Sequence, residues 1–240
     1  MRMWWIIPAG ITGLLAIIFG KKTKFMHPKK TKPIYETSDW AYLIYPMADA
    51  AKIEPLFCLA WIKVESGGNP CAWGSATAKG PDGHPREQGI VQLYNPDDFK
   101  KFQVASGALR KYCTPGTQVC SRMLTDAEMQ VQAKAAMDLI LHCREVAGMA
   151  AAKNGLRWRP KDQLKLVKLV HGLPGLVKSG VALATKHLGR APRDWLEFKT
   201  AVNATKMDAG TEKYRNLFPK VFANAEKVTA GLPDDTHVVT

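Results

Sequence analysis

An uncharged stretch near the start of the chain, Met3–Gly20, is the feature that most restricts how the protein can fold. Its 18 positions approach the roughly 20 apolar residues that a helix needs to cross a bilayer, and exceed the lower limit of about 17. Trp4 and Trp5 suit the interfacial end of such a helix, and a lysine run from Lys21 ends the apolar stretch. The sequence therefore predicts one N-terminal transmembrane helix, with residues 1–20 as a membrane anchor.

A cleavable signal peptide would begin in the same way, with a charge such as Arg2 before an apolar run. However, no small-x-small cleavage site follows Gly20, and no cysteine stands there to carry a lipid. We therefore expect a retained single-span anchor.

The positive charge of the chain is concentrated next to this segment. Six lysines between Lys21 and Lys32 account for 6 of the net +13 charges. A basic run beside an apolar span suits anionic lipid head groups, and no basic motif with interleaved aromatic residues points to nucleic acid. We predict a basic linker over residues 21–37, a lipid membrane as one partner and no nucleic-acid partner.

From residue 38 onward the pattern is helical. We expect a helix capped by Asp39 and interrupted at Pro46, and a second helix that begins at Pro55, is apolar nearly all round and ends at the Gly67-Gly68 pair. Further helices are expected at Thr125 onward, where a capping box stands, and at Lys161–Val170, Leu176–Leu188, Arg193–Thr205 and Tyr214–Val228.

Residues 72–98 are rich in Gly, Pro and Asp, which predicts a loop or a small irregular β region. The fold class is thus mostly α, in a single domain over residues 38–229, followed by a flexible tail over residues 230–240.

The five cysteines cannot all pair within one chain. Cys113 and Cys120 bracket a turn-rich loop, so their spacing predicts a local disulfide in an oxidising compartment. A zinc site that adds His142 and Cys143 is the alternative, but no spacing matches a known ligand pattern. We therefore predict no metal and no other cofactor.

Glu65 stands at the end of the second predicted helix, between apolar residues and a Gly-Gly turn. Apolar surroundings disfavour the charged form of a carboxyl and so raise its pKa. A raised pKa suits a general acid, which must hold a proton near neutral pH. The position alone fits a solvated glutamate near a helix C-terminus better than it fits a general acid.

Three segments in order resemble the motifs of soluble lytic transglycosylases and goose-type lysozyme relatives. Leu59–Pro70 resembles the Glu-Ser motif, Gly89–Leu93 resembles Gly-Leu-Met-Gln, and Val170–Val177 resembles Tyr-Asn-Ala-Gly-Pro-Gly-x-Val. The resemblance covers roughly residues 40–225. It implies a lysozyme-like fold of the α+β superfamily with Glu65 as the catalytic residue.

The third motif departs from the family pattern. Val170 and His171 stand where the family has tyrosine and asparagine, and that tyrosine helps to hold the catalytic carboxyl. His171 or Tyr94 would have to replace it. The first two motifs are also farther apart than usual, with Ala78–Gln88 as a polar insertion.

The resemblance implies cleavage of the β-1,4 bond between N-acetylmuramic acid and N-acetylglucosamine, with a 1,6-anhydro product. Trp73 is a candidate for stacking on a sugar. The predicted substrate-binding residues are Ser75, Gly89, Ile90, Gln92, Tyr94 and His171.

Two alternatives remain. A hydrolytic lysozyme would use a second carboxylate, for which the candidates are Asp82, Glu87, Asp97 and Asp98. A non-catalytic, membrane-anchored structural or glycan-binding virion protein would keep the fold without the chemistry.

The predicted partners are peptidoglycan strands, the membrane, and proteins of a virion or a secretion complex. The expected place of action is the bacterial periplasm and cell wall, during phage entry or assembly of an envelope complex. Lysines that follow the span favour a cytoplasmic position for the domain. A viral membrane delivered to a bacterial envelope would reconcile this with a wall-cleaving role.

Overall fold

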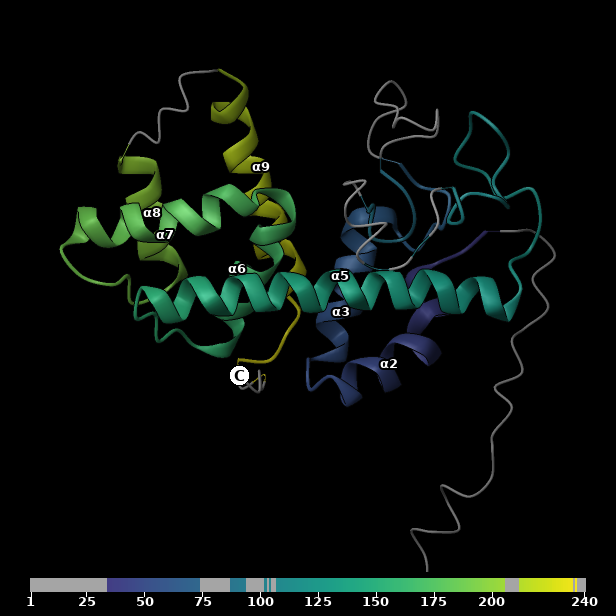
Figure 1. Cartoon of the computed structure of the whole chain (residues 1–240), viewed down its shortest axis with the longest axis horizontal. Coiled ribbons are helices and arrows are strands. Elements are labelled where there is room, and N and C mark those ends of the chain that lie inside the picture. The colour runs from purple at the N-terminus through teal and green to yellow at the C-terminus, as the bar shows by residue number, and fades with distance from the viewer. Residues whose placement is uncertain are drawn as a thin grey trace, which may run out of the picture. The chain divides into compact units, whose positions relative to one another are not determined.

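The computed structural model describes residues 34–73, 87–93, 102, 104, 107–205, 212–234 and 236, with backbone alone over 212–217 (Figure 1). The predicted membrane anchor and most of the predicted linker lie outside these residues, as do Ser75, Asp82, Tyr94, Asp97 and Asp98. In the described part, no helix is both long and apolar enough to cross a membrane.

The described residues are mostly helical, as predicted, and they contain no strand. Their β pairing is confined to two isolated antiparallel bridges, Gln88 with Leu93 and Cys113 with Cys120. The helices are η1 Thr37–Trp40 (a 3-10 helix), α2 Ala41–Ala50, α3 Pro55–Ser66, α5 Asp126–Lys153, α6 Pro160–Gly172, α7 Pro174–Leu188, α8 Trp195–Ala204 and α9 Glu212–Thr229.

Helix α3 is built as its sequence predicts. Pro55 occupies the first turn, where no backbone donor is needed, and the Glu54 carboxylate accepts a hydrogen bond from the Leu56 N–H at 3.1 Å. Gly67 ends the helix in the left-handed conformation at φ 64°. The helix packs against η1, α2, α5 and α9, which makes it a central element of the core.

Helix α5 is the long element of the structure, with 28 residues. Thr125 and Glu128 form the predicted capping box at its start, with bonds of 3.3 and 2.9 Å between side chain and backbone. Figure 1 shows α2 and α3 along one half of α5, and α6 to α9 along the other. Helix α5 therefore packs against both groups of helices, and α3 of the first group and α6 of the second meet at Glu65.

Helix α6 is held from several sides. It packs against α5, α7, α8 and α9. An aromatic cluster lies beside it, in which Trp195 and Phe222 have ring centroids 5.4 Å apart, and Trp158 and Phe198 have centroids 5.6 Å apart. Since α9 also packs against α3, it ties α6 to the helix that carries Glu65.

The fold extends beyond the boundaries that the sequence predicts. Tyr35, assigned to the linker, is buried, and its hydroxyl accepts a 2.7 Å bond from the Leu124 N–H. Leu232 and Thr236, assigned to the tail, are buried too, and the Leu232 carbonyl accepts from Lys161 Nζ at 2.8 Å. These isolated residues find their partners far along the chain, which local composition does not reveal.

The predicted disulfide partner is wrong. The disulfide joins Cys113 to Cys71, with a Cα–Cα distance of 5.7 Å. Cys113 and Cys120 do lie opposite each other in a bridge, as their spacing suggests, and Cys120 Sγ lies 3.3 Å from Cys71 Sγ. Tertiary folding brings Cys71 between them from 42 residues away. Among the described residues, no cluster of three or more potential metal ligands occurs.

Substitution of Gly68 by Ala tests the junction that follows α3. Gly68 has φ +92°, and an added Cβ would lie 2.3 Å from the backbone carbonyl carbon of Glu36. We expect Gly68→Ala to lower the free energy of unfolding by about 2–4 kcal/mol, because backbone strain and a clash add together. The measurement is urea denaturation of the full chain.

Gly67→Ala is the matched control. Gly67 also has positive φ, at +64°, but nothing lies within 4 Å of an added Cβ. It should cost only about 1 kcal/mol. Equal losses for the two variants would contradict the packing described for this junction.

Candidate active site around Glu65

Glu65 lies in the last turn of α3, and its carboxylate faces α6. Its side chain is 15% exposed, and Oε1 accepts a hydrogen bond from Lys168 Nζ. The same oxygen lies 3.4 Å from His171 Nδ1. Lys168 and His171 are three residues apart on α6 and therefore project from one face of it. The first and third sequence motifs thus meet at a single carboxylate.

Lys168 is the most deeply buried charge of this group. Its side chain is only 4% exposed, and Nζ lies 3.2 Å from His171 Nδ1. The ammonium lies 4.7 Å from the centroid of the Trp61 ring, a distance at which the ring face attracts a cation. The His171 ring lies 5.4 Å from the same indole. Trp61 lies one turn before Glu65 on α3, and its ring therefore packs against both the Lys168 ammonium and the His171 ring.

The pKa of the Glu65 carboxyl is opposite to the sequence prediction. Burial raises this pKa, as the apolar helix suggests, but the charges and hydrogen bonds of His171 and Lys168 outweigh burial and lower it from 4.5 to about 2. The prediction was wrong because the cations come from α6, about 100 residues away in the sequence. Glu65 is thus a carboxylate at neutral pH in this arrangement.

The second motif fastens the end of α3. Gln92 has φ 54°, and its side-chain amide donates a 2.6 Å bond to the Glu65 backbone carbonyl. Ser66 Oγ donates to the Ile90 carbonyl at 2.7 Å and approaches the Ile62 carbonyl at 3.1 Å. The Gln92 bond satisfies the Glu65 carbonyl, which belongs to the last turn of the helix and has no partner within it. Gln92 and Ser66 therefore hold the backbone that presents Glu65.

The backbone of the second motif is in turn held by α5. The Ile90 N–H donates to Gln132 Oε1 at 3.1 Å, and Gln132 is itself buried. Gly89 has φ +81°, and a Cβ there would lie 2.6 Å from the same Gln132 oxygen. The amide and carbonyl of Ile90 are both engaged within the protein, so its role in the described structure is to position Glu65.

Five of the seven predicted site residues thus fall within one constellation: Glu65, Gly89, Ile90, Gln92 and His171. The other two, Ser75 and Tyr94, lie outside the described residues. The sequence offered His171 and Tyr94 as replacements for the family tyrosine that holds the catalytic carboxyl. In the structure, His171 lies next to that carboxylate.

Lys168 and Trp61 were not predicted. Lys168 stands three residues before His171, and Trp61 stands four residues before Glu65. On a helix these spacings place each pair on one face, so the helix assignment was the signal that could have pointed to both residues.

Trp73 was predicted as a candidate for sugar stacking, but its ring is already covered on one side. The Arg110 guanidinium lies 4.5 Å from the Trp73 ring centroid. Arg110 is buried and donates hydrogen bonds to the carbonyls of Cys71 and Thr117 at 2.9 and 3.0 Å. At most one face of the indole remains for a ligand.

Glu87 is the one candidate second carboxylate that the structure describes. It directly precedes the second motif, and its Oε2 atom is buried without a hydrogen-bond partner. A buried carboxylate oxygen in this condition is costly. Glu87 therefore has unused acceptor capacity next to the segment that positions Glu65.

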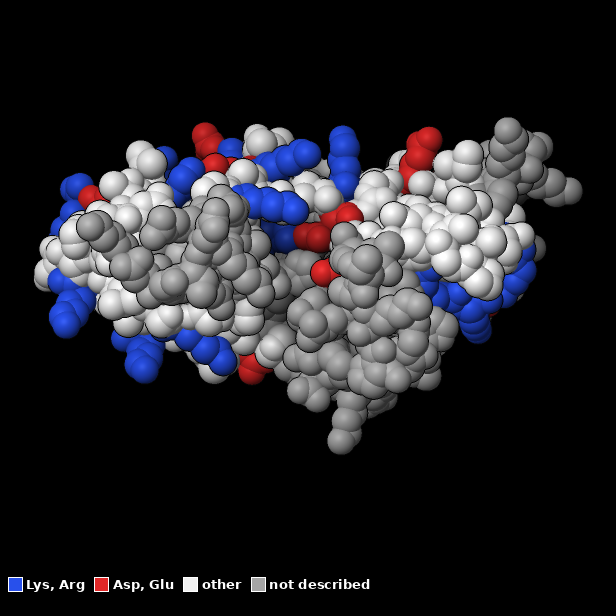
Figure 2. All heavy atoms as spheres, turned by 90° about the horizontal axis from the view of Figure 1, so that it is seen from above, with Lys and Arg blue, Asp and Glu red and all other residues white. Residues whose placement is uncertain are grey.

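Seen from above, the molecule has a hollow midway along its length in which acidic and basic atoms lie side by side (Figure 2). At the Glu65 site charges of both signs also meet, because Lys168 Nζ contacts Glu65 Oε1. Because the Glu65 side chain is 15% exposed, solvent can reach part of its carboxylate while the protein covers the rest.

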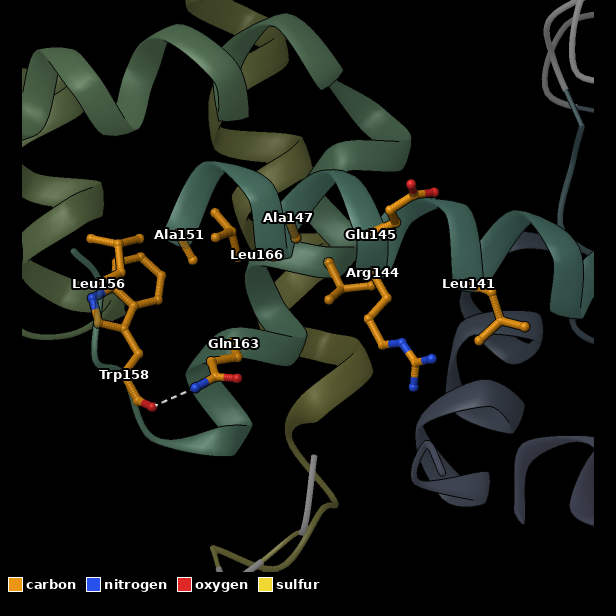
Figure 3. Close-up of a pocket in the computed structure, with 11 residues that line it drawn as sticks. Leu141, Arg144, Glu145, Ala147, Ala151, Leu156, Trp158, Gln163 and Leu166 are labelled. Atoms are coloured by element: carbon orange, nitrogen blue, oxygen red, sulfur yellow. Dashed lines mark hydrogen bonds between the residues drawn. The ribbon is translucent and has the colours of Figure 1, made fainter. Parts of the chain in front are cut away.

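A separate pocket of about 520 Å³ lies against α5 and α6, away from Glu65 (Figure 3). Apolar groups such as Leu156, Trp158 and Leu166 dominate its lining. Its cation, Arg144, is engaged with the carbonyl of Ala51 at 2.8 Å, and Gln163 donates to the Trp158 carbonyl at 2.8 Å. The Arg144 and Gln163 side chains of this pocket are thus engaged within the protein, and we assign no chemistry to it.

Comparison of the chain with protein-family models, with curated proteins and with solved structures gives no match. The chemistry of the Glu65 site is therefore the guide to the function of this chain.

The Glu65 pairing predicts a specific dependence of stability on pH. The folded-state pKa of about 2 lies below the ordinary 4.5, so the pairing stabilises the fold fully above pH 4.5 and is lost as the pH falls toward 2. We expect Glu65→Gln to lower the free energy of unfolding at neutral pH by about 2–4 kcal/mol, because it leaves the Lys168 charge buried without its counter-ion. The difference from wild type should shrink on acidification through that window, as urea denaturation at several pH values would measure.

Glu145→Gln is the control for this series, since the Glu145 side chain is 69% exposed. It should change stability by no more than about 0.5 kcal/mol at any pH. A Glu65→Gln deficit that stays constant from neutral to acidic pH would contradict the assigned pairing.

Proposed function

We propose that this chain is a peptidoglycan lytic transglycosylase with Glu65 as its catalytic acid and base, carried by a lysozyme-like helical domain. One observation supports this above all: the three segments that resemble the family motifs converge on the Glu65 residue. Gln92 of the second segment binds its backbone, and His171 of the third lies 3.4 Å from its carboxylate. Nothing in the local sequence requires three segments so far apart to meet there.

In the proposed reaction, Glu65 acts twice. As the carboxylic acid it protonates the glycosidic oxygen between N-acetylmuramic acid and N-acetylglucosamine, and the bond to C1 breaks. As the carboxylate it takes the proton of the muramic C6 hydroxyl, whose oxygen then bonds to C1. The 1,6-anhydro product forms without water, so a single protein carboxylate is sufficient.

The remaining residues of the site position this carboxylate. The hydrogen bonds of Gln92 and Ser66 hold the end of α3, and Trp61 supports the α6 side chains that contact the acid. A reacting group that is held rigidly loses less entropy on reaching the transition state. His171 takes over the contact that tyrosine makes in the family.

Hydrolysis by a lysozyme mechanism is the second candidate, and the Glu87 carboxylate favours it. Its buried oxygen without a partner could activate a water molecule as the second carboxylate of a glycosidase. The two candidates differ in product: hydrolysis leaves a reducing muramic end, whereas transglycosylation leaves an anhydro end.

For the biological setting we propose local opening of the cell wall by a membrane-anchored enzyme. The proposed anchor spans residues 1–20 and contains the uncharged stretch Met3–Gly20, and the basic linker after it would lie at anionic head groups. Phage entry, or assembly of an envelope-spanning complex, requires such a confined opening. The proposed partners are peptidoglycan strands, the membrane and proteins of the virion or complex.

The proposed function predicts clearing of purified peptidoglycan by the full chain and release of 1,6-anhydromuramyl fragments. Glu65→Gln should lower the rate of release by at least about 10³-fold, because the amide can neither give nor take the proton. The measurement is a zymogram followed by mass spectrometry of the soluble products.

Glu87→Gln separates the candidates and serves as the matched control. Under the proposed mechanism it keeps most of the activity and the same anhydro products. Reducing muramic ends, together with a loss of activity in Glu87→Gln, would assign the hydrolytic mechanism. Absence of clearing by wild type, with intact binding to peptidoglycan, would favour the non-catalytic glycan-binding role.

A further inference from the structure

The proposed function does not explain why a buried ammonium, that of Lys168, lies against the catalytic carboxyl. It is 4% exposed, and its polar contacts in the described structure are Glu65 Oε1 and His171 Nδ1, with the Trp61 ring as a third neighbour. A buried ammonium is tolerated only when it is paired. Its pairing with Glu65, however, keeps the carboxyl ionised, whereas the first step of glycan cleavage requires the acid.

The same protons can be arranged in a second way. An ammonium–carboxylate pair and an amine–carboxylic acid pair contain equal numbers of protons and differ only in where one proton lies. Water favours the charged pair, and removal of water favours the neutral pair. The exposed 15% of the Glu65 side chain is the part that water can still reach. A glycan strand bound over Glu65 would remove that contact.

We propose that Lys168 supplies Glu65 with the proton for catalysis when a glycan strand covers the site. An N–H bond of the Lys168 ammonium breaks, an O–H bond forms on Glu65, and Lys168 becomes a neutral amine. This inference rests on the proposed function and adds the origin of the proton to it.

The proton balance closes over one cycle. Glu65 gives the proton to the glycosidic oxygen and recovers one from the muramic C6 hydroxyl. When the product leaves and water returns, that proton passes back to Lys168 and the ion pair forms again. Lys168 contacts Glu65 and is only 4% exposed, so it acts through Glu65.

The other groups that face Glu65 are compatible with this transfer. His171 Nδ1 lies 3.2 Å from Lys168 Nζ and 3.4 Å from Glu65 Oε1, so the ring contacts both partners of the transfer. Its charge acts with that of Lys168 to keep the Glu65 carboxyl ionised in the resting site. Gln92 approaches the backbone carbonyl of Glu65 and leaves the carboxylate to the α6 side chains.

Two substitutions of Lys168 separate proton supply from simple pairing. Lys168→Arg keeps the positive charge but holds its protons, because guanidinium does not deprotonate in proteins. We expect it to lower kcat by at least about 100-fold while KM changes by less than about threefold. The assay is release of anhydromuramyl fragments by the full chain from purified peptidoglycan.

Lys168→Met is the matched partner, since it removes both the charge and the proton. Without the Lys168 charge, Glu65 can take its proton from solvent at mildly acidic pH. We expect Lys168→Met to exceed Lys168→Arg in kcat by at least about tenfold there, and to lose this activity as the pH rises. A purely structural ion pair predicts the reverse order, with arginine the better substitute.

A direct measurement keeps the inference testable if either variant folds poorly. In wild type labelled with ¹⁵N at lysine Nζ, the Lys168 resonance is assigned by its loss in Lys168→Arg. Saturation with tri-N-acetylchitotriose, a probe without a muramic residue, should move it from the ammonium to the amine range. An ammonium signal in the saturated complex would overturn the inference.

Failure of the inference can be told apart from failure of the proposed function. If wild type releases no fragments, the proposed function itself fails. If wild type is active and depends on Glu65, but Lys168→Arg retains the wild-type kcat, only the role of Lys168 as proton donor is excluded.

Discussion

The contact between Glu65 and Lys168 is the interaction on which the proposed site depends. It joins the end of α3 to the middle of α6 with both charges largely removed from water, at 15% and 4% exposure. Breaking such a pair from one side is expensive, because the remaining charge stays buried. Helices α5 and α9 each pack against both α3 and α6, which keeps the two partners of the pair together. His171 and Trp61 complete the pair's surroundings.

The same contact sets the chemistry of the carboxylate. Burial and opposite charge act on the Glu65 pKa in opposite directions, and the cations prevail in the resting site. A catalytic acid that rests as a carboxylate must obtain its proton when substrate arrives. A partner that holds a proton and loses its hydration at the same moment meets that requirement. We therefore propose a use for the buried Lys168 beyond stabilising the fold, because it lies against Glu65 and holds a proton there.

Around this centre, neutral hydrogen bonds provide precision. Ser66, Gln92 and Gln132 link the end of α3, the second motif and α5 through bonds of 2.6 to 3.1 Å. Gly68 allows the chain to turn directly against the backbone of Glu36, and its carbonyl accepts from Trp40 Nε1 at 2.8 Å. The disulfide between Cys71 and Cys113 stabilises the adjoining loop. Each link is short-ranged and therefore depends on the helices being correctly placed first.

The sequence by itself determined the features whose causes are local. Pro55, Gly67 and the Thr125–Glu128 capping box define helix ends through neighbouring backbone groups, and the order of three motifs singles out Glu65. Only the tertiary structure decided what surrounds that carboxylate. Lys168 reaches it across 103 residues of sequence, Cys71 displaces Cys120 as the partner of Cys113, and Tyr35 enters the core from a segment that reads as linker. The physical reason is common to all three: pairing of charges, sulfurs and buried side chains depends on distance in space, which helical periodicity and turn residues do not encode.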